Sequence, residues 1–266
     1  MISSRVVHLA CCCFLLCGTS SGAFAQQTSV ASDGLRASAS IPSSAVPPRP
    51  ALTPELRGDI YMARKMYHDA IDMYRQAPQD SPAVANKIGI AFHQLLEFNL
   101  AKKNYEHAIK LDPKFPEAIN NLGTIYYEQK SYKRAISYYK RALKYSPQAA
   151  CTYVNLGAAY FARKDYKHAT EYYEQALKLD PDVFEHHGTY GTLMQERTAG
   201  ERATFHLYLA KMYAKAGAND RALIYLRKAL EEGVKDRNKI PDMPEFASLK
   251  TDPGFKQLLI ENPKPL

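Results

Sequence analysis

Several residues of the kinds that bind metal ions lie close together in the sequence: Glu185, His186 and His187 are consecutive, and His206 follows them. Imidazole nitrogens and carboxylate oxygens are zinc ligands, but zinc sites draw their ligands from recognisable spacings. This group has no fourth ligand at a fixed spacing, so the simpler interpretation is a set of solvated polar side chains on a loop. A metal-dependent binder or an enzyme centred on residues 184–206 stays open as an alternative.

Catalytic and cofactor-binding motifs are absent from the sequence. It contains no glycine-rich phosphate loop, no His-Glu-x-x-His pair, no Gly-x-Ser-x-Gly turn and no paired cysteines at metal-binding spacing. We therefore expect no catalytic residue, no cofactor and no bound metal ion, and a chain that is not an enzyme.

A repeat of 34 residues organises the chain from Pro82 to Asp182. In units counted from Pro82, Pro116 and Ala150, position 8 is glycine, positions 20 and 27 are alanine, position 24 is tyrosine and position 32 is proline. Together with an aromatic residue at position 11, these spacings match one face of each of two helices. The glycines, the position-20 alanines and the prolines are Gly89, Gly123, Gly157, Ala101, Ala135, Ala169, Pro113, Pro147 and Pro181.

The small residues of the repeat have a packing reason. Two antiparallel helices approach closely only where one of them lacks bulk, and large aromatic side chains fill the space around that contact. Proline at position 32 removes a backbone donor and ends the second helix. The pattern extends to a divergent first unit from Ala51, with Gly58 and Ala70, and to a last unit from Ala203, with Ala222 and with alanine at position 8.

This pattern resembles the tetratricopeptide repeat, of the secreted bacterial type, at every diagnostic position except the first-helix tryptophan, which is Ala85, Ile119 or Tyr153 here. The resemblance implies an all-α fold, a right-handed superhelical solenoid of antiparallel helix pairs with about five repeats and a short C-terminal helical cap. The expected units are residues 51–81, 82–115, 116–149, 150–183 and 203–236, with an insertion at 184–202 and capping helices at 237–266.

The resemblance also implies a concave groove, lined by the first helix of each unit, that holds an extended peptide. A side-chain amide both donates and accepts hydrogen bonds, so stacked asparagines can pair with a peptide backbone whatever its sequence. That the position-6 asparagines, Asn121 and Asn155, only satisfy neighbouring backbone is an equally open interpretation. The family's charged clamp for C-terminal carboxylates is not matched. Carried over by position, the groove candidates are Asn86, His93, Asn120, Asn121, Tyr127, Asn155 and Phe161.

The first 25 residues have the features of a secretory leader. Arg5 precedes an apolar run over residues 9–17, and a small-x-small cleavage site follows at residues 23–25. The apolar run is too short to span a bilayer, so we expect no transmembrane segment in the mature chain. The leader predicts export to the periplasm or the extracellular space.

Residues 26–50 are rich in Ser, Ala and Pro, with too little apolar content to pack, and are expected to form a disordered linker. Beyond the leader the chain has one cysteine, Cys151, which we expect to be a small buried or half-buried helix residue.

The net charge of +8 is spread along helix faces, for example at Lys133, Arg134, Lys140, Arg141 and Lys144. A solvated convex face is the favoured interpretation, because no basic run is interleaved with stacking aromatic residues on one exposed surface. We therefore expect no nucleic-acid partner.

Repeat stacks form long curved surfaces that suit protein partners. The expected function is accordingly a non-catalytic protein–protein interaction scaffold that binds a partner polypeptide in the concave groove, during envelope assembly or secretion. A purely structural subunit of an envelope complex, using the convex face or the end cap, is a second alternative.

Overall fold

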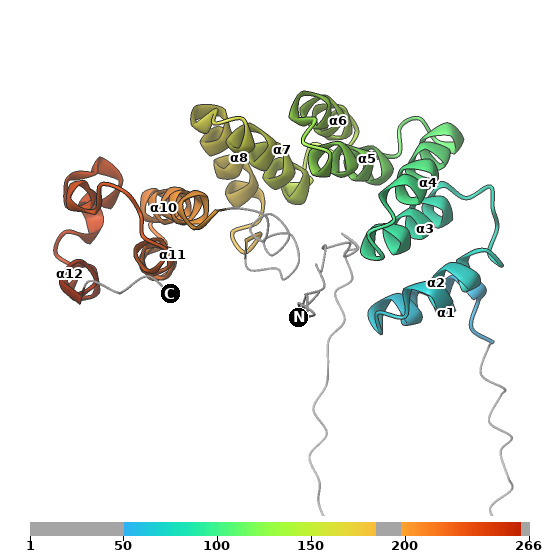
Figure 1. Ribbon diagram of the computed structural model, residues 1–266, viewed down its shortest axis with the longest axis horizontal. Helices are drawn as coiled ribbons and strands as arrows, with labels where there is room; N and C mark the ends of the chain where they lie inside the picture. Colours follow the sequence, from blue (N-terminus) through green and yellow to red (C-terminus); the bar gives the residue numbers. More distant parts are fainter. Residues whose placement is uncertain (1–50, 185–197, 262–266) are drawn as a thin grey trace, which may run out of the picture.

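The computed structural model describes residues 51–184 and 198–261. The expected leader (1–25), the expected linker (26–50) and the residues Glu185, His186 and His187 lie outside the described residues. Within them, five pairs of antiparallel α-helices follow one another along the chain, and three short helices complete its C-terminal end (Figure 1). The expected all-α solenoid of helix pairs is therefore confirmed.

Each pair consists of a first and a second helix joined by a short turn. The first helices are α1 (Pro54–Ala63), α3 (Pro82–Gln94), α5 (Pro116–Glu128), α7 (Ala150–Ala162) and α10 (Ala199–Lys215). The second helices are α2 (Tyr67–Tyr74), α4 (Phe98–Leu111), α6 (Tyr132–Tyr145), α8 (Tyr166–Leu179) and α11 (Asn219–Glu231). Two 3-10 helices, η1 (Arg237–Asp242) and η2 (Pro244–Leu249), precede the last helix, α12 (Pro253–Glu261).

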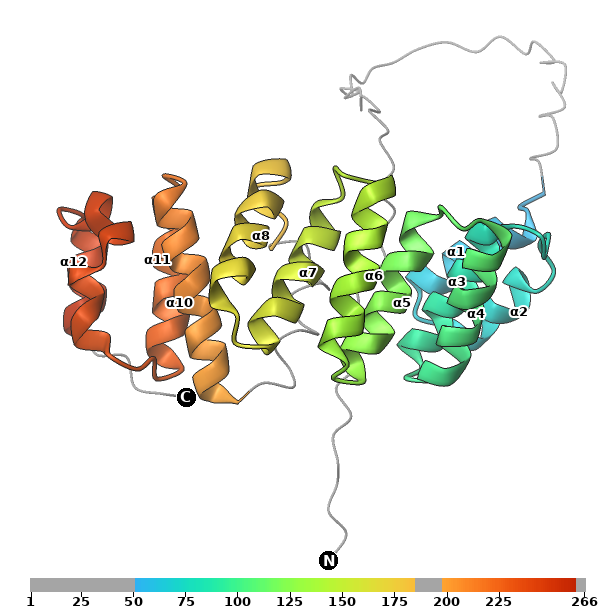
Figure 2. The same cartoon turned by 90° about the horizontal axis from the view of Figure 1, so that it is seen from above.

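The pairs stack side by side, so that the second helix of one pair also contacts the first helix of the next (Figure 2). Consecutive first helices touch each other as well, α3 with α5 and α5 with α7. The stack curves into an arch (Figure 1). We call the side formed by α3, α5 and α7 the inner face and the side formed by α4, α6 and α8 the outer face.

A glycine on each of the first four first helices lies against a tyrosine ring of the second helix. A Cβ atom added to Gly123 would lie 2.8 Å from the Tyr139 ring, and one added to Gly157 would lie 2.6 Å from the Tyr173 ring. Side-chain carbons do not approach that closely, so the position-8 glycine lets the two helices meet. The alanines at position 20 are buried as well, with Ala101 fully excluded from solvent.

The ends of the helices follow local sequence rules. Thr53 caps α1 by accepting a hydrogen bond from the Leu56 backbone N–H, and Pro54 is its first residue. At the other end of each unit, α4, α6 and α8 stop two residues before the position-32 proline. Helix α10 begins at Ala199, before the expected start of the last unit, because Thr198 and Glu201 form a capping box.

The last helix pair is covered by apolar side chains of the terminal segment. Phe246 and Leu249 of η2 and Phe255 and Leu258 of α12 are all at most 2% exposed. Asp252 caps α12 by accepting a hydrogen bond from the Phe255 backbone N–H at 3.0 Å. Such a cover is needed because the last repeat of a solenoid otherwise leaves an apolar face in water.

One expectation about a single side chain is wrong. Cys151 is exposed, because it is the second residue of α7 and its side chain lies outside the contact between helices. None of the helices among residues 51–184 and 198–261 is both long enough and apolar enough to cross a membrane.

Candidate functional site

A chain of asparagine side chains crosses the three first helices of the inner face. The Nδ2 group of Asn155 on α7 donates to Oδ1 of Asn120 on α5 at 3.1 Å. Asn120 donates in turn to Oδ1 of Asn121 at 3.2 Å, and Asn121 donates to Oδ1 of Asn86 on α3 at 3.0 Å. We call these four residues the asparagine ladder.

The repeat spacing builds this ladder. Each bond between helices joins position 6 of one unit to position 5 of the unit before it, a separation of 35 residues. Because neighbouring first helices contact each other directly, side chains at these two positions can reach across the gap. The sequence predicted the members of the ladder, and the structure adds that they bond to one another.

The ladder leaves hydrogen-bonding capacity unused at its accessible members. Asn120 and Asn155 are half-buried, whereas Asn86 and Asn121 are only 6% and 5% exposed. A primary amide has two N–H donors and an oxygen with two lone pairs. Each bond of the ladder uses one N–H and one lone pair, so Asn120 keeps a second N–H and a second lone pair for another partner.

Of the three aromatic candidates, only Tyr127 has appreciable exposed surface. Tyr127 is half-buried beside Tyr132, and it follows Asn120 by seven residues, so the two share one face of α5. His93 is 3% exposed, and burial lowers its pKa from 6.5 to about 4. Phe161 is 5% exposed, and its ring meets Tyr166, Phe205 and Tyr208 edge-on. A role for the groove candidates in binding stays a prediction.

In the second unit position 6 is Lys87 in place of asparagine, and this residue forms ion pairs with the first unit where the later units have hydrogen-bonded asparagines. Its ammonium group lies 2.8 Å from carboxylate oxygens of both Glu55 and Asp59, which belong to α1. The Tyr74 hydroxyl also donates to Asp59 at 2.8 Å. The first pair is therefore tied to the second by charge, and sequence reasoning did not single out this contact.

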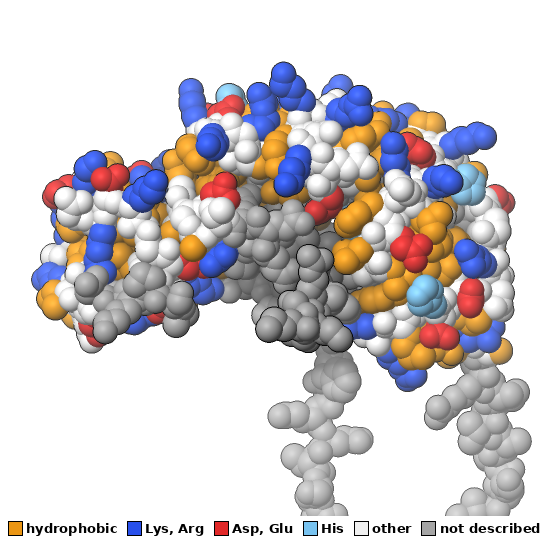
Figure 3. Space-filling model, viewed as in Figure 1, with side chains coloured by type: hydrophobic (Ala, Val, Ile, Leu, Met, Phe, Trp, Pro, Cys, Tyr) orange, Lys and Arg blue, Asp and Glu red, His pale blue; other side chains and the backbone are white. Residues whose placement is uncertain are grey.

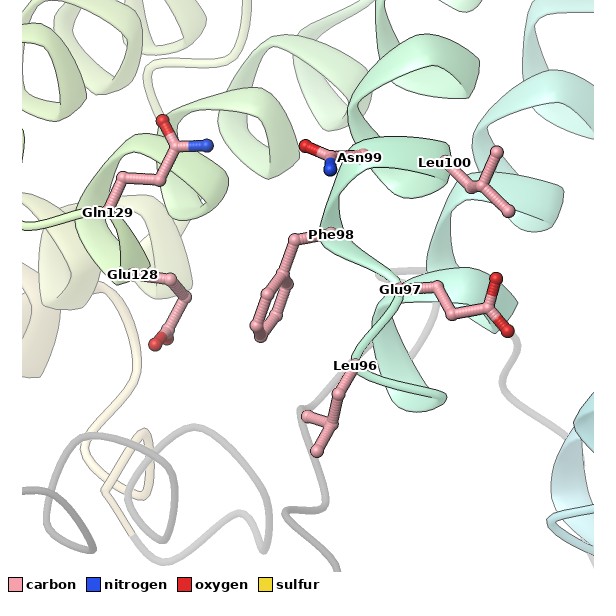
Figure 4. A pocket seen from close by; sticks show the side chains of 7 residues that line it. All are labelled: Leu96, Glu97, Phe98, Asn99, Leu100, Glu128 and Gln129. Carbon is pink, nitrogen blue, oxygen red and sulfur yellow. The ribbon is translucent and has the colours of Figure 1, made fainter.

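A hollow of about 540 Å³ lies between the turn that joins α3 to α4 and the C-terminal end of α5 (Figure 4). Leu96 of that turn is 55% exposed and has a positive φ of 61°. Its counterparts in the neighbouring turns are lysines, so leucine was a signal that sequence reasoning passed over. The hollow is lined by Leu96, Glu97, Phe98, Asn99, Leu100, Glu128 and Gln129.

His206 lies in the core of the last pair. It is 5% exposed, and its Nδ1 is 2.5 Å from Oε2 of Glu232. Burial lowers the pKa of His206, and the Glu232 carboxylate opposes that shift in part. No group of three or more metal-binding side chains occurs among the residues that the structure describes. The remaining members of the suggested metal cluster, Glu185, His186 and His187, lie outside those residues.

Comparisons with protein-family models and with known proteins indicate which family the repeats belong to. One model of the tetratricopeptide repeat matches residues 116–182, and a second, described as TPR repeat, matches residues 89–130. A search of curated proteins found no match.

Solved structures of similar fold include one described as the functional characterization of pilF from Pseudomonas aeruginosa. It is 20% identical, has a TM-score of 0.52, and the match covers 79% of this chain and 86% of that chain. The crystal structure of MamA is 22% identical with a TM-score of 0.45, covering 66% of this chain and 93% of that chain. The crystal structure of YrrB, described as a TPR protein with an unusual peptide-binding site, is 22% identical with a TM-score of 0.41, covering 47% and 66%.

At such low identity, the likeness to pilF shows the fold alone. The family models add a match in sequence over residues 89–182, which contain the glycine, alanine and tyrosine positions of the repeat. With five helix pairs among the described residues and two family models matching the repeat, this chain is a tetratricopeptide repeat protein.

Proposed function

We propose that the inner face holds an extended segment of a partner polypeptide and that the protein is a non-catalytic interaction scaffold. The observation that carries this proposal is the asparagine ladder, which holds half-used, accessible amide groups on α5 (Asn120) and α7 (Asn155). Each of these amides can both donate and accept, as the backbone of an extended chain requires, because that backbone presents an N–H and a carbonyl group at every non-proline residue.

The ladder also fixes these amides before a partner arrives. An isolated surface asparagine loses rotamer freedom when it binds, whereas Asn120 and Asn155 are already held by their bond to each other. Pre-organised amides bind the backbone with little dependence on the partner's sequence. Preference among partners then comes from neighbouring surfaces, of which half-buried Tyr127 is one.

The cellular setting of this scaffold follows from the expected leader at residues 1–25. We propose that the chain is exported and that its partner is another envelope or secreted polypeptide, held during assembly or secretion. The family supports a protein partner in general, because helix-pair repeats build curved surfaces used for protein binding.

The proposal is tested by placing a photo-crosslinking amino acid at Tyr127 on the inner face and, in a separate variant, at exposed Gln175 on the outer helix α8. Each variant is irradiated in its native envelope, and crosslinked peptides are identified by mass spectrometry. Crosslinks from position 127 to one recurrent segment of another polypeptide, without the same segment at position 175, support the proposal. The same segment from position 175 alone places binding on the outer face and refutes it.

The contribution of the ladder is measured with the double variant Asn120→Ala and Asn155→Ala. The variant removes both partners of the bond between Asn155 and Asn120, but it also leaves Oδ1 of buried Asn121 without its donor. A loss of about 1–3 kcal/mol in stability is therefore expected, and folding of the variant is checked by circular dichroism. The matched control is Asn104→Ala, since the side chain of Asn104 on α4 donates to the Leu100 carbonyl of its own helix and lies outside the ladder. Loss of the recurrent crosslink in the double variant but not in the control is expected; unchanged crosslinking in a folded double variant removes the ladder from the proposal.

A further inference from the structure

Helix α6 carries five basic side chains and no acidic one. Lys133, Arg134, Lys140 and Lys144 are exposed, and Arg141 is half-buried. Cations at positions 140 and 144 are one turn apart on the same side of the helix, where like charges repel and destabilise it. We call these five residues the basic crest.

The repeat itself shows that the fold does not require this charge. One unit earlier and one unit later, the same five positions of α4 and α8 hold a mixture of acidic, basic and neutral residues. These helices still form and pack as α6 does. The counterparts are Asn99, Leu100, Glu106, His107 and Lys110 on α4, and Lys167, His168, Glu174, Gln175 and Lys178 on α8.

The basic crest is also not neutralised within the fold. Among the ion pairs of the described residues, which include Lys102 with Glu106 and Lys215 with Glu174, none uses a cation of α6. Arg141 donates instead to the Pro113 carbonyl at 2.8 Å. The charge of α6 is therefore directed to the surface, where Arg134 and Lys140 lie over tyrosine rings and no carboxylate of the described residues pairs with the helix.

The shape of this surface limits what can bind there. Helix α6 lies near the top of the arch, and basic side chains line the arch's upper, outer edge (Figures 1 and 3). A convex crest offers no groove for an extended polypeptide. A flat surface, in contrast, touches a convex body at its crest.

Neighbouring rings are not available to stack on nucleic-acid bases. Tyr126 stacks on Tyr138 with centroids 5.1 Å apart, and Arg134 lies over the Tyr126 ring. Tyr160 stacks on Tyr172 at 5.4 Å, and Lys140 lies over the Tyr160 ring. Tyr145 at the end of α6 is 43% exposed, but one open ring provides no row on which the successive bases of a single strand can stack.

We propose that the basic crest docks the protein on an anionic lipid bilayer, with the inner face turned away from the membrane. Lysine and arginine near an anionic membrane surface are attracted to its headgroups, and the attraction falls off within a Debye length. This inference is independent of what the asparagine ladder binds. It assigns α6 to attachment and leaves the inner helices accessible to a partner.

The test is cosedimentation of the purified full chain with two kinds of vesicle, phosphatidylcholine alone and phosphatidylcholine mixed with phosphatidylglycerol. The test variant is K133Q/K140Q/K144Q, in which glutamine preserves helix propensity. The control K235Q/K250Q/K256Q removes the same charge from exposed lysines near the C-terminal end of the arch. All chains share one N-terminal region, so any difference among them arises from the substituted lysines.

Wild type and control are expected to bind the anionic vesicles, and the α6 variant to bind them about a hundredfold more weakly, since each lysine contributes roughly a factor of five. Binding should also weaken as salt is added. Three outcomes overturn the proposal: equal binding to neutral and anionic vesicles, equal loss in both triple variants, or binding of DNA but not of vesicles through the same three lysines.

Discussion

The contact between glycine and tyrosine in each of the first four helix pairs predicts that one substitution has opposite effects on stability in two backgrounds. The three atoms nearest to a Cβ atom added to Gly157 would all belong to the Tyr173 ring, at 2.6 to 3.1 Å. The last pair solves the same packing problem differently, with Ala210 and Leu226 at the equivalent positions, both fully buried. The perturbation is Gly157→Ala, made once in the wild type and once together with Tyr173→Leu.

The magnitudes follow from two opposing effects. Alanine is about 1 kcal/mol better than glycine in a helix interior. Crowding the Tyr173 ring, which is 1% exposed and cannot move outward, costs about 1–3 kcal/mol. Gly157→Ala should therefore lower the free energy of unfolding of the wild type by about 1 kcal/mol. Tyr173→Leu alone should cost about 2–4 kcal/mol through lost packing.

In the Tyr173→Leu background the crowding is gone, so Gly157→Ala should raise the free energy of unfolding by about 1 kcal/mol. The coupling energy between the two sites is then about 2 kcal/mol, within the range for contacting residues. The assay is urea unfolding of the four proteins, followed by circular dichroism. A coupling below about 0.5 kcal/mol, or a Gly157→Ala variant more stable than wild type, would refute the packing argument.

Two further predictions concern stability. Because burial lowers the pKa of His93 from 6.5 to about 4, the unfolded chain binds more protons between these values. The free energy of unfolding should therefore fall as the pH drops from 7 to 4, with about 3 kcal/mol of the fall due to this residue. Urea midpoints measured across that range should fall less in the His93→Gln variant than in the wild type. Equal pH dependence in both proteins would argue against a buried neutral imidazole. Lys87→Met should cost about 1–2 kcal/mol, because it leaves Glu55 and Asp59 without their common cation. Hydrogen exchange should then accelerate in α1 and α2 while α7 and α8 stay protected, and uniform acceleration would contradict a local role.

The helix pairs could be predicted from the sequence because their contacts are local to one unit. Gly123 and Tyr139 belong to the two helices of one pair, so their contact depends only on a fixed spacing within that unit. The caps Thr53 and Asp252 are local in the same sense, since each accepts a hydrogen bond from the backbone N–H three residues later. Such features depend on nearby residues alone.

Features that depend on the offset between units were harder to predict. The sequence identified Asn86, Asn121 and Asn155 by position, but the bonds between them require knowing how far α3, α5 and α7 slide past one another. Phe161 was expected to line the groove by its position in the repeat, and Phe205, from beyond the expected insertion, packs against its ring. How deeply a side chain of the inner face is buried depends on residues of the adjacent units, which the sequence of a single repeat does not contain.

The central claim is that the inner face recognises the backbone of an extended polypeptide. It is tested most directly with two versions of the segment found by crosslinking, one with ordinary amides and one N-methylated at alternate backbone nitrogens. Binding to the full chain is measured by fluorescence anisotropy. The account predicts that N-methylation weakens binding by about tenfold or more, since each lost hydrogen bond contributes about 1 kcal/mol, and that the Asn120→Ala, Asn155→Ala variant barely distinguishes the two peptides. Equal affinity of the wild type for both peptides would contradict it.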